Sequence, residues 1–146
     1  MNLYRLRIII AVTVMFAVMA SCGTSSAQEG DIVTMHMKIN DVPVSVEWED
    51  NETVKALTER LPITLKMSMY GGFEQVGSLG RSLPRNDKRI TTHAGDIVLY
   101  SGNQIVVFYG SNTWAYTKLG RITGKTPSEL ADLLGKTDVV LTLSAD

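Results

Sequence analysis

The chain is poor in cysteine and histidine and has no excess of positive charge. Its 146 residues include one cysteine, Cys22, so no internal disulfide can form and the region after Cys22 has no thiol nucleophile. The two histidines, His36 and His93, stand in no pattern with Cys, Asp or Glu, so we expect no metal site. The sequence also lacks a G-x-S-x-G nucleophile elbow and a phosphate-binding loop. We therefore expect no catalytic residue and no cofactor.

No apolar run is long enough to cross a membrane as a helix. The uncharged stretch 8–20 (IIIAVTVMFAVMA) has 13 residues, whereas a membrane-spanning helix needs about 20. It follows Arg5 and Arg7 and ends in small residues. A basic start, a short apolar run and small residues are typical of a secretory signal.

The only cysteine follows this run directly, in MASCG. This segment resembles the lipobox of bacterial lipoproteins, in which the cysteine is diacylated and becomes the new N-terminus. The resemblance implies a signal peptide over 1–21 and a lipid on Cys22, whose acyl chains would anchor the protein by burying CH₂ groups. The alternative is an ordinary signal cleaved after Ala20 or at Ala27, which leaves Cys22 without a role.

The segment after Cys22 is small and polar. GTSSAQEG indicates a flexible tether, so we expect residues 22–30 to join the lipid to a single domain over 31–146. The protein would then be exported and lipid-anchored to a bacterial membrane in the cell envelope. Loss of residues 1–21 removes two of the 14 Lys and Arg side chains, leaving 12 against 15 acidic ones, a formal charge of −3. This charge argues against nucleic acid as a partner.

Alternating apolar and polar residues predict a mainly β domain. Two such segments, 33–39 and 42–48, flank Asn40-Asp41, whose residue types tolerate positive φ, so we expect a β-hairpin there. A second, very apolar hairpin, IVLYSGNQIVVFY over 97–109, is predicted to turn at Gly102-Asn103. Further strands are predicted over 63–68, 115–123 and 138–144.

Two short helices complete the predicted elements. In EDNETVKALTERLP, Asp50 or Asn51 can cap a helix that ends at Pro62. In KTPSELADLLG, Thr126 and Glu129 form a capping box before a terminal glycine. Two helices cannot cover both faces of a parallel sheet, so the fold class we expect is mainly β, a closed or nearly closed β-barrel. The Gly-rich segment 70–89 is a long excursion with one or two brief strands.

These elements, in this order, resemble the bacterial cyclophilin-like family of small β-barrels. The matching segments are INDVPVSVEWEDNETVKAL, LPITLKMSMYGG, AGDIVLY, GNQIVVFYG and the terminal helix and strand. The resemblance implies an eight-stranded, barrel-like fold with helices at its ends. It implies no activity, because most members of that family lack an established one.

True cyclophilins suggest one activity, prolyl cis–trans isomerisation. GGFEQVG is similar to their GF-x-x-Q-G segment, and the catalytic arginine lies five residues before its Phe. That position here, counted back from Phe73, is Ser68, and in IVVFYG Ile105 stands where their histidine would be. An isomerase would therefore need a relocated cation from Arg81 or Arg85.

The leading prediction is a membrane-tethered, non-catalytic barrel that binds a small molecule or peptide at its rim. The aromatic candidates would make apolar contacts, the amide and phenol would hydrogen-bond, and the arginine would contact a carboxylate. A histidine at a strand entrance completes the predicted rim. The predicted ligand-binding residues are Phe73, Gln75, Arg81, His93, Tyr100 and Trp114.

The sequence allows two alternatives to a binding protein: an isomerase with a relocated arginine, and a structural envelope protein without a ligand. An open pocket holding Arg81 would favour binding or catalysis, whereas a barrel plugged by Phe108 would favour the structural role. The basic segment 81–89 is either a solvated loop or an anion contact. Whether the hairpin over 97–109 lines a site or fills a core is left open by the sequence.

Overall fold

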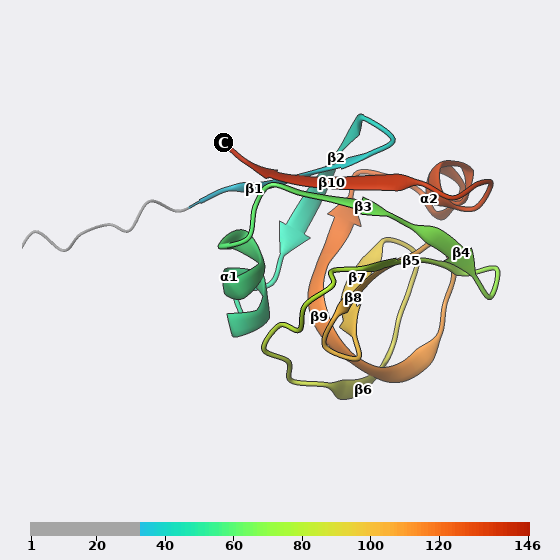
Figure 1. Ribbon diagram of the computed structural model, residues 1–146. Helices are drawn as coiled ribbons and strands as arrows, with labels where there is room; N and C mark the ends of the chain where they lie inside the picture. Colours follow the sequence, from blue (N-terminus) through green and yellow to red (C-terminus); the bar gives the residue numbers. More distant parts are fainter. Residues whose placement is uncertain (1–32) are drawn as a thin grey trace, which may run out of the picture. The chain divides into compact units, whose positions relative to one another are not determined.

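A computed structural model describes residues 33–146 (Figure 1). The predicted signal peptide, the Cys22 lipid site and the tether lie outside the described residues. Within them, ten strands and two helices form a mainly β fold, as predicted. No helix in this part of the chain is long and apolar enough to span a bilayer.

Along the chain most strands are followed by another strand, and the two helices interrupt this series after β2 and after β9. Their bounds are β1 Met35–Ile39, β2 Val42–Trp48, α1 Glu52–Thr58, β3 Ile63–Lys66, β4 Ser68–Tyr70, β5 Glu74–Ser78, β6 Lys88–Thr91, β7 Asp96–Tyr100, β8 Gln104–Phe108, β9 Thr113–Thr123, α2 Pro127–Leu134 and β10 Val140–Ala145. The segment 70–89 thus holds β5 and the start of β6.

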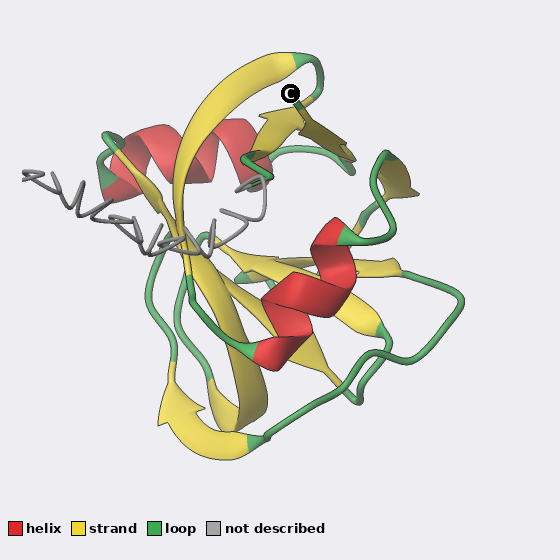
Figure 2. Cartoon of the chain, turned by 90° about the vertical axis from the view of Figure 1, so that its left-hand side faces the viewer, coloured by secondary structure: helices red, strands yellow, loops and turns green. Residues whose placement is uncertain are grey.

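Local sequence signals fix the first hairpin and both helices. Asn40 and Asp41 have φ of 48° and 64°, the left-handed turn that their residue types favour. The Asn51 side chain accepts a 2.9 Å hydrogen bond from the N–H of Val54 and so caps α1. At α2 the Thr126 hydroxyl accepts from the N–H of Glu129 at 3.2 Å. The predicted hairpin and caps are confirmed, and the two helices lie well apart beside the strands (Figure 2).

The strands form one antiparallel path that nearly closes on itself. Their order is β3-β10-β1-β2-β9-β7-β8-β5-β4, and β6 pairs with β9 beside this path. Only Met67 separates β3 from β4, and its N–H donates to the carbonyl of Val139 at 2.8 Å. Because β3 pairs with β10 and β4 with β5, the segment 63–70 joins both ends of the sheet. Counted as one strand, this segment makes the wall eight-stranded, as the family resemblance implies.

The longest strand, β9, bends around one side of the barrel (Figure 1). It pairs with β2 at its end, with β7 in its middle and with β6 at its start, and its register against β7 shifts between Ile97 and Val98. Where β9 meets β2, a Cβ on Gly120 would lie 2.5 Å from the carbonyl oxygen of Glu47, so glycine permits this close approach. The bend brings the start of β9 to the site described below.

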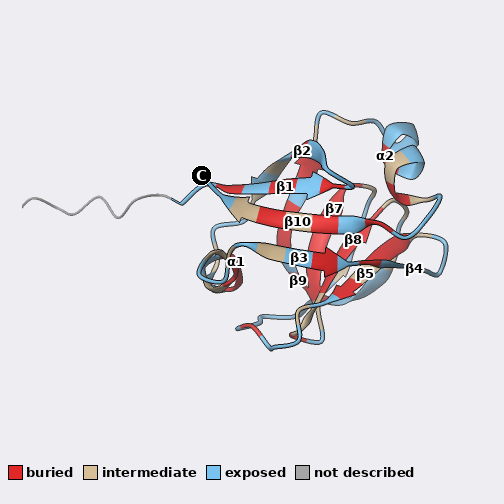
Figure 3. Ribbon diagram, turned by 45° about the horizontal axis from the view of Figure 1, so that its top comes forward, coloured by how far each residue is buried: buried red, intermediate tan, exposed pale blue. Residues whose placement is uncertain are grey.

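The hairpin of β7 and β8 is buried on both faces (Figure 3). Ile97, Leu99, Ile105 and Val107 belong to the main core, together with side chains of β1, β10 and both helices. The alternate residues lie in a second, smaller core that contains Val98, Val106, Phe108 and Tyr116. The hairpin therefore fills one core and forms the base of another.

Several sequence-predicted boundaries differ from the structure; for example, α1 ends at Thr58, before Pro62, and β10 begins at Val140 rather than at residue 138. The turn of the β7–β8 hairpin contains the predicted Gly102-Asn103 but is one residue longer, because Tyr100 pairs with Gln104; φ is positive at Ser101 (51°) and Gly102 (77°). The strand predicted from residue 115 begins at Thr113, since pairing with β6 extends it. Neither the exact length of the turn nor the pairing of β9 with β6 can be read from the local periodicity of the sequence.

Candidate functional site

A pocket of 680 Å³ opens on the second face of the β7–β8 hairpin. It is bordered by β4, β5, β8, the ends of β3 and β7 and the start of β9, so the bend of β9 supplies one of its walls. Along β5, β8 and β9 it is alternate residues that line the pocket, as the period of two requires. Those used below are Lys66, Tyr70, Glu74, Tyr100, Gln104, Val106, Asn112, Trp114 and Tyr116.

Aromatic side chains dominate the pocket. The rings of Tyr100 and Tyr116 meet edge to face with centroids 6.1 Å apart. The Asn112 side chain donates a 2.8 Å hydrogen bond to the hydroxyl of Tyr116, which fixes that ring from the other side. Trp114 and Tyr70 are 53% and 66% exposed and stand at the rim. Exposed aromatic rings beside an opening offer apolar area and a polar tip to a ligand.

Glu74 is the unusual residue of this pocket. It is only 7% exposed, and its Oε2 is buried without a hydrogen-bond partner. Its direct cross-strand neighbours are Tyr70 on β4 and Phe108 on β8, neither of which carries a positive charge. Burial raises the pKa of Glu74 from its usual 4.5 to about 7. A carboxyl group that changes charge near neutral pH therefore lies in an aromatic pocket.

Tyr116 responds to the same environment. Burial raises the pKa of its phenol, the hydrogen bond from Asn112 lowers it, and the charges of Glu74 and Tyr100 add smaller increases. The sequence prediction missed both Glu74 and Tyr116. The available signal for Glu74 was a charged residue in the Phe-Glu-Gln segment that opens an otherwise uncharged strand, EQVGS.

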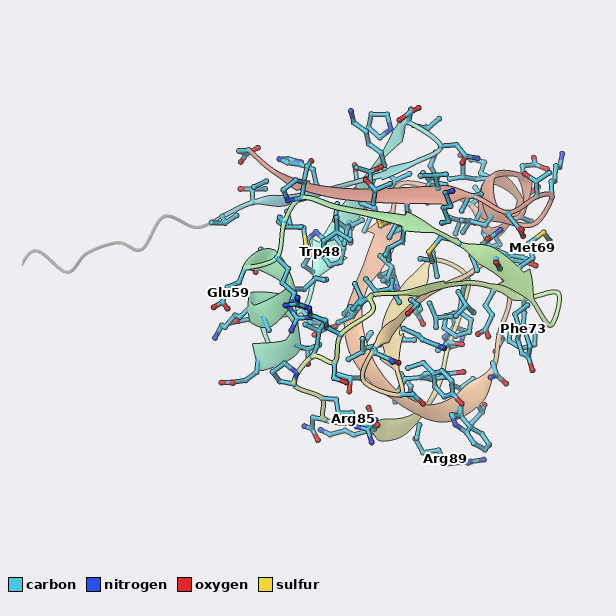
Figure 4. All side chains as sticks on the ribbon, in the orientation of Figure 1. Trp48, Glu59, Met69, Phe73, Arg85 and Arg89 are labelled. Atoms are coloured by element: carbon cyan, nitrogen blue, oxygen red, sulfur yellow. The ribbon has the colours of Figure 1, made fainter. Side chains whose placement is uncertain are left out.

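Two of the predicted ligand-binding residues, Tyr100 and Trp114, line this pocket. Phe73 lies at the β4–β5 turn near Met69 (Figure 4) and stacks on Phe108 with centroids 6.5 Å apart and an interplanar angle of 4°. It supports the second core and is not among the lining residues. The structure thus brings together two of the three predicted aromatic residues, Tyr100 and Trp114, in one pocket.

The polar candidates lie elsewhere. Arg81 is exposed and is not among the residues that line the pocket. His93 has a 69% exposed side chain, 3.9 Å from the carboxylate of Asp96. From the basic segment 81–89, Arg85 and Lys88 border a separate pocket of 590 Å³, and Arg85 pairs with Asp87 at 3.4 Å. Figure 4 shows Arg85 and Arg89 at the β6 end of the molecule.

Gln75 is fully buried and holds the end of α2. Its side-chain nitrogen donates to the carbonyl oxygens of Leu134 at 2.7 Å and Thr137 at 2.8 Å. These bonds satisfy the carbonyl of the last residue of α2 and one in the loop that follows, for which the helix itself offers no donor.

We expect Gln75→Ala to lower the free energy of unfolding by about 2–4 kcal/mol, because the buried carbonyl of Leu134 and the partly buried carbonyl of Thr137 lose their donor. Urea denaturation measures this loss. The matched variant Gln104→Ala, at the partly exposed rim, should cost under about 1 kcal/mol. Equal losses in the two variants would contradict a structural role for Gln75.

The fold and the pocket define a class: a small antiparallel barrel with a cavity on one side of its central hairpin. Residues 37–144 match the model of the cyclophilin-like family, and the chain belongs to this family. The chain matches no curated protein sequence at a significant level. Among residues 33–146, no three His, Cys, Asp or Glu side chains come together as a metal site would require.

Proposed function

We propose that this domain is a non-catalytic binding protein, which holds a small molecule or an extended peptide in the pocket lined by Tyr100, Trp114 and Glu74. We propose further that a lipid on Cys22 anchors it to a bacterial membrane in the cell envelope. The observation that carries the binding proposal is a buried carboxyl group without a partner, set among aromatic side chains in an open pocket.

The size and lining of the pocket support this proposal. Ligand pockets occupy about 300–1,000 Å³ and combine apolar walls with a few polar groups. This pocket falls within that range at 680 Å³, with Val106 and the tyrosines as walls and Glu74 and Asn112 as polar groups.

The isomerase reading finds no support here. Within residues 33–146, the lining of this pocket includes no arginine, and Arg85, one of the two relocated candidates, borders the other pocket. Because neither arginine predicted as the relocated cation lines this pocket, we do not advance this activity.

We expect ligands to shift the indole N–H resonance of Trp114 in a two-dimensional ¹⁵N spectrum. The probes are a panel of small soluble amines, alcohols and acids and a set of short extended peptides. Trp48 is the internal control, because its indole N–H donates to the carbonyl of Met35 at 2.8 Å, away from the pocket. Trp114→Phe assigns the two signals. A panel that moves neither signal would favour the structural envelope role.

The membrane anchor has a separate test. Cys22→Ala removes the only thiol that can be acylated, so the variant should leave the membrane fraction and appear in the soluble fraction. Immunoblotting of fractionated cells, with Ser21→Ala as the matched control, measures the distribution. A variant that stays in the membrane pellet would contradict acylation at Cys22.

A further inference from the structure

We propose that the pocket recognises an organic cation, an ammonium group on an apolar body, which enters between the aromatic side chains and pairs with Glu74. This inference rests on the proposed binding function and names its ligand class. Two sources share this chemistry: a free small amine and the side chain of a lysine in a peptide.

The first argument is the missing partner of Glu74. A buried carboxylate is stable only when a positive charge or several hydrogen bonds compensate it. The ion pairs formed within residues 33–146 do not include Glu74, and its Oε2 has no hydrogen-bond donor. By contrast, the buried carboxylate of Asp96 pairs with Arg121 at 2.8 Å. Asp96 thus has a cationic partner within the barrel and Glu74 has none, which is the position that a cationic ligand would take.

The second argument is the aromatic lining. Tyr70 on β4, Tyr100 on β7, and Trp114 and Tyr116 on β9 border the same 680 Å³ pocket as Glu74. A cation within about 6 Å of a Trp or Tyr ring gains about 0.5–2 kcal/mol from the negative face of the ring. An ammonium group is small enough to meet several rings and one carboxylate together. A negatively charged ligand would meet the unpaired carboxylate instead.

The groups that face Glu74 predict how the affinity for a cation depends on pH. They are Tyr70 from β4, Tyr100 from β7 and Tyr116 from β9, while β8 contributes Gln104, Val106 and Phe108, which do not titrate. Lys66 of β3 is exposed and also borders the pocket, but forms no ion pair with Glu74. With its pKa at about 7, Glu74 is mostly protonated in weakly acidic solution and must release its proton when a cation binds.

The experiment is calorimetric titration of the domain with phenethylammonium and with its neutral analogue phenethyl alcohol. The affinity for the ammonium should rise up to about tenfold per pH unit between pH 5 and pH 6.5 and level off above pH 8. In two buffers of different ionisation enthalpy, the heats at pH 6 should report the release of almost one proton. The alcohol should bind at least about tenfold more weakly at pH 8.

Two variants keep the test specific. Glu74→Gln preserves shape and should abolish the pH dependence and the proton release, with an affinity loss of about tenfold or more at pH 8. Trp114→Leu, at a position that is 53% exposed, should weaken the binding of the ammonium and leave its pH dependence intact. Peptides with a central lysine or acetyl-lysine separate the two sources, because preferential binding of the lysine peptide over phenethylammonium identifies a protein ligand.

Several results would overturn the inference. Equal binding of the ammonium and the alcohol, or an affinity that falls as pH rises, would leave the pocket as a binding site and remove its preference for cations. If the indole N–H resonance of Trp114 shifts with the alcohols or acids of the ligand panel but not with the amines, the preference for cations would also be wrong. An ammonium that binds equally to wild type and to Glu74→Gln would remove Glu74 from recognition.

Discussion

Replacing Glu74 with glutamine is expected to raise the free energy of unfolding by about 2–3 kcal/mol at pH 8 and to change it little near pH 4. Most substitutions of buried residues destabilise a protein, so a stabilising change at a buried position is an unusual expectation. Its physical reason is the charge that Glu74 must carry above its pKa without a partner.

The sign of the pH dependence follows from the raised pKa of Glu74, about 7 in the folded protein against 4.5 ordinarily. Below about pH 4.5 the carboxyl group is protonated in both states and contributes no difference. Between about pH 4.5 and 7 the unfolded state loses the proton while the folded state keeps it, so stability falls as pH rises. Above about pH 7 the full loss persists. Glutamine is neutral throughout and avoids the loss.

Urea denaturation of both proteins at steps from pH 4 to pH 8 measures the difference. The two exposed histidines, His36 and His93, are present in both proteins, so any contribution from them cancels in the difference. Glu49→Gln is the matched control, because that exposed glutamate pairs with Lys118 at 3.6 Å and its replacement should not stabilise the protein. A wild type and Glu74→Gln whose stabilities differ equally at all pH values would contradict the burial of an unpaired carboxylate.

The parts of the fold that were predicted correctly depend on neighbours in sequence. The turn at Asn40-Asp41 and the cap of Thr126 on α2 each involve residues within a few positions, and their chemistry is visible in the residue types. The barrel class followed from the number of strands and the shortage of helices. The sequence did not predict that the segment 63–70 closes the sheet. Its periodicity indicates one strand, whereas Met67 divides the segment into β3 and β4.

The candidate site depends on contacts between distant segments, and this limited its prediction. Trp114 reaches the pocket because β9 bends, and Gln75 was assigned to a ligand although its partners are 59 and 62 residues away in α2 and beyond it. Periodicity does indicate that Glu74 and Gln75 point to opposite faces of β5. It does not indicate which face is occupied by a helix end and which opens to a pocket.

Phe108→Ala is expected to lower the free energy of unfolding by about 3–5 kcal/mol. The ring is fully buried, stacks on Phe73 and meets Tyr116 edge to face with centroids 5.6 Å apart. Its removal leaves a cavity whose walls are β-strands paired on both sides, and such walls cannot collapse to fill it. Thermal or urea denaturation gives the loss.

Phe73→Ala is the matched comparison, since the same side chain is removed from the other member of the stacked pair. Phe73 is half-buried at a turn, so its loss should cost about half as much as the loss of Phe108. The larger loss at Phe108 would mean that the hairpin over 97–109 supports a true second core beneath the pocket. Equal losses would mean that the ring pair sits at the surface as one unit, and the pocket would then lack the rigid base on which its aromatic walls depend. The hairpin would in that case serve the main core alone, through Ile97, Leu99 and their neighbours.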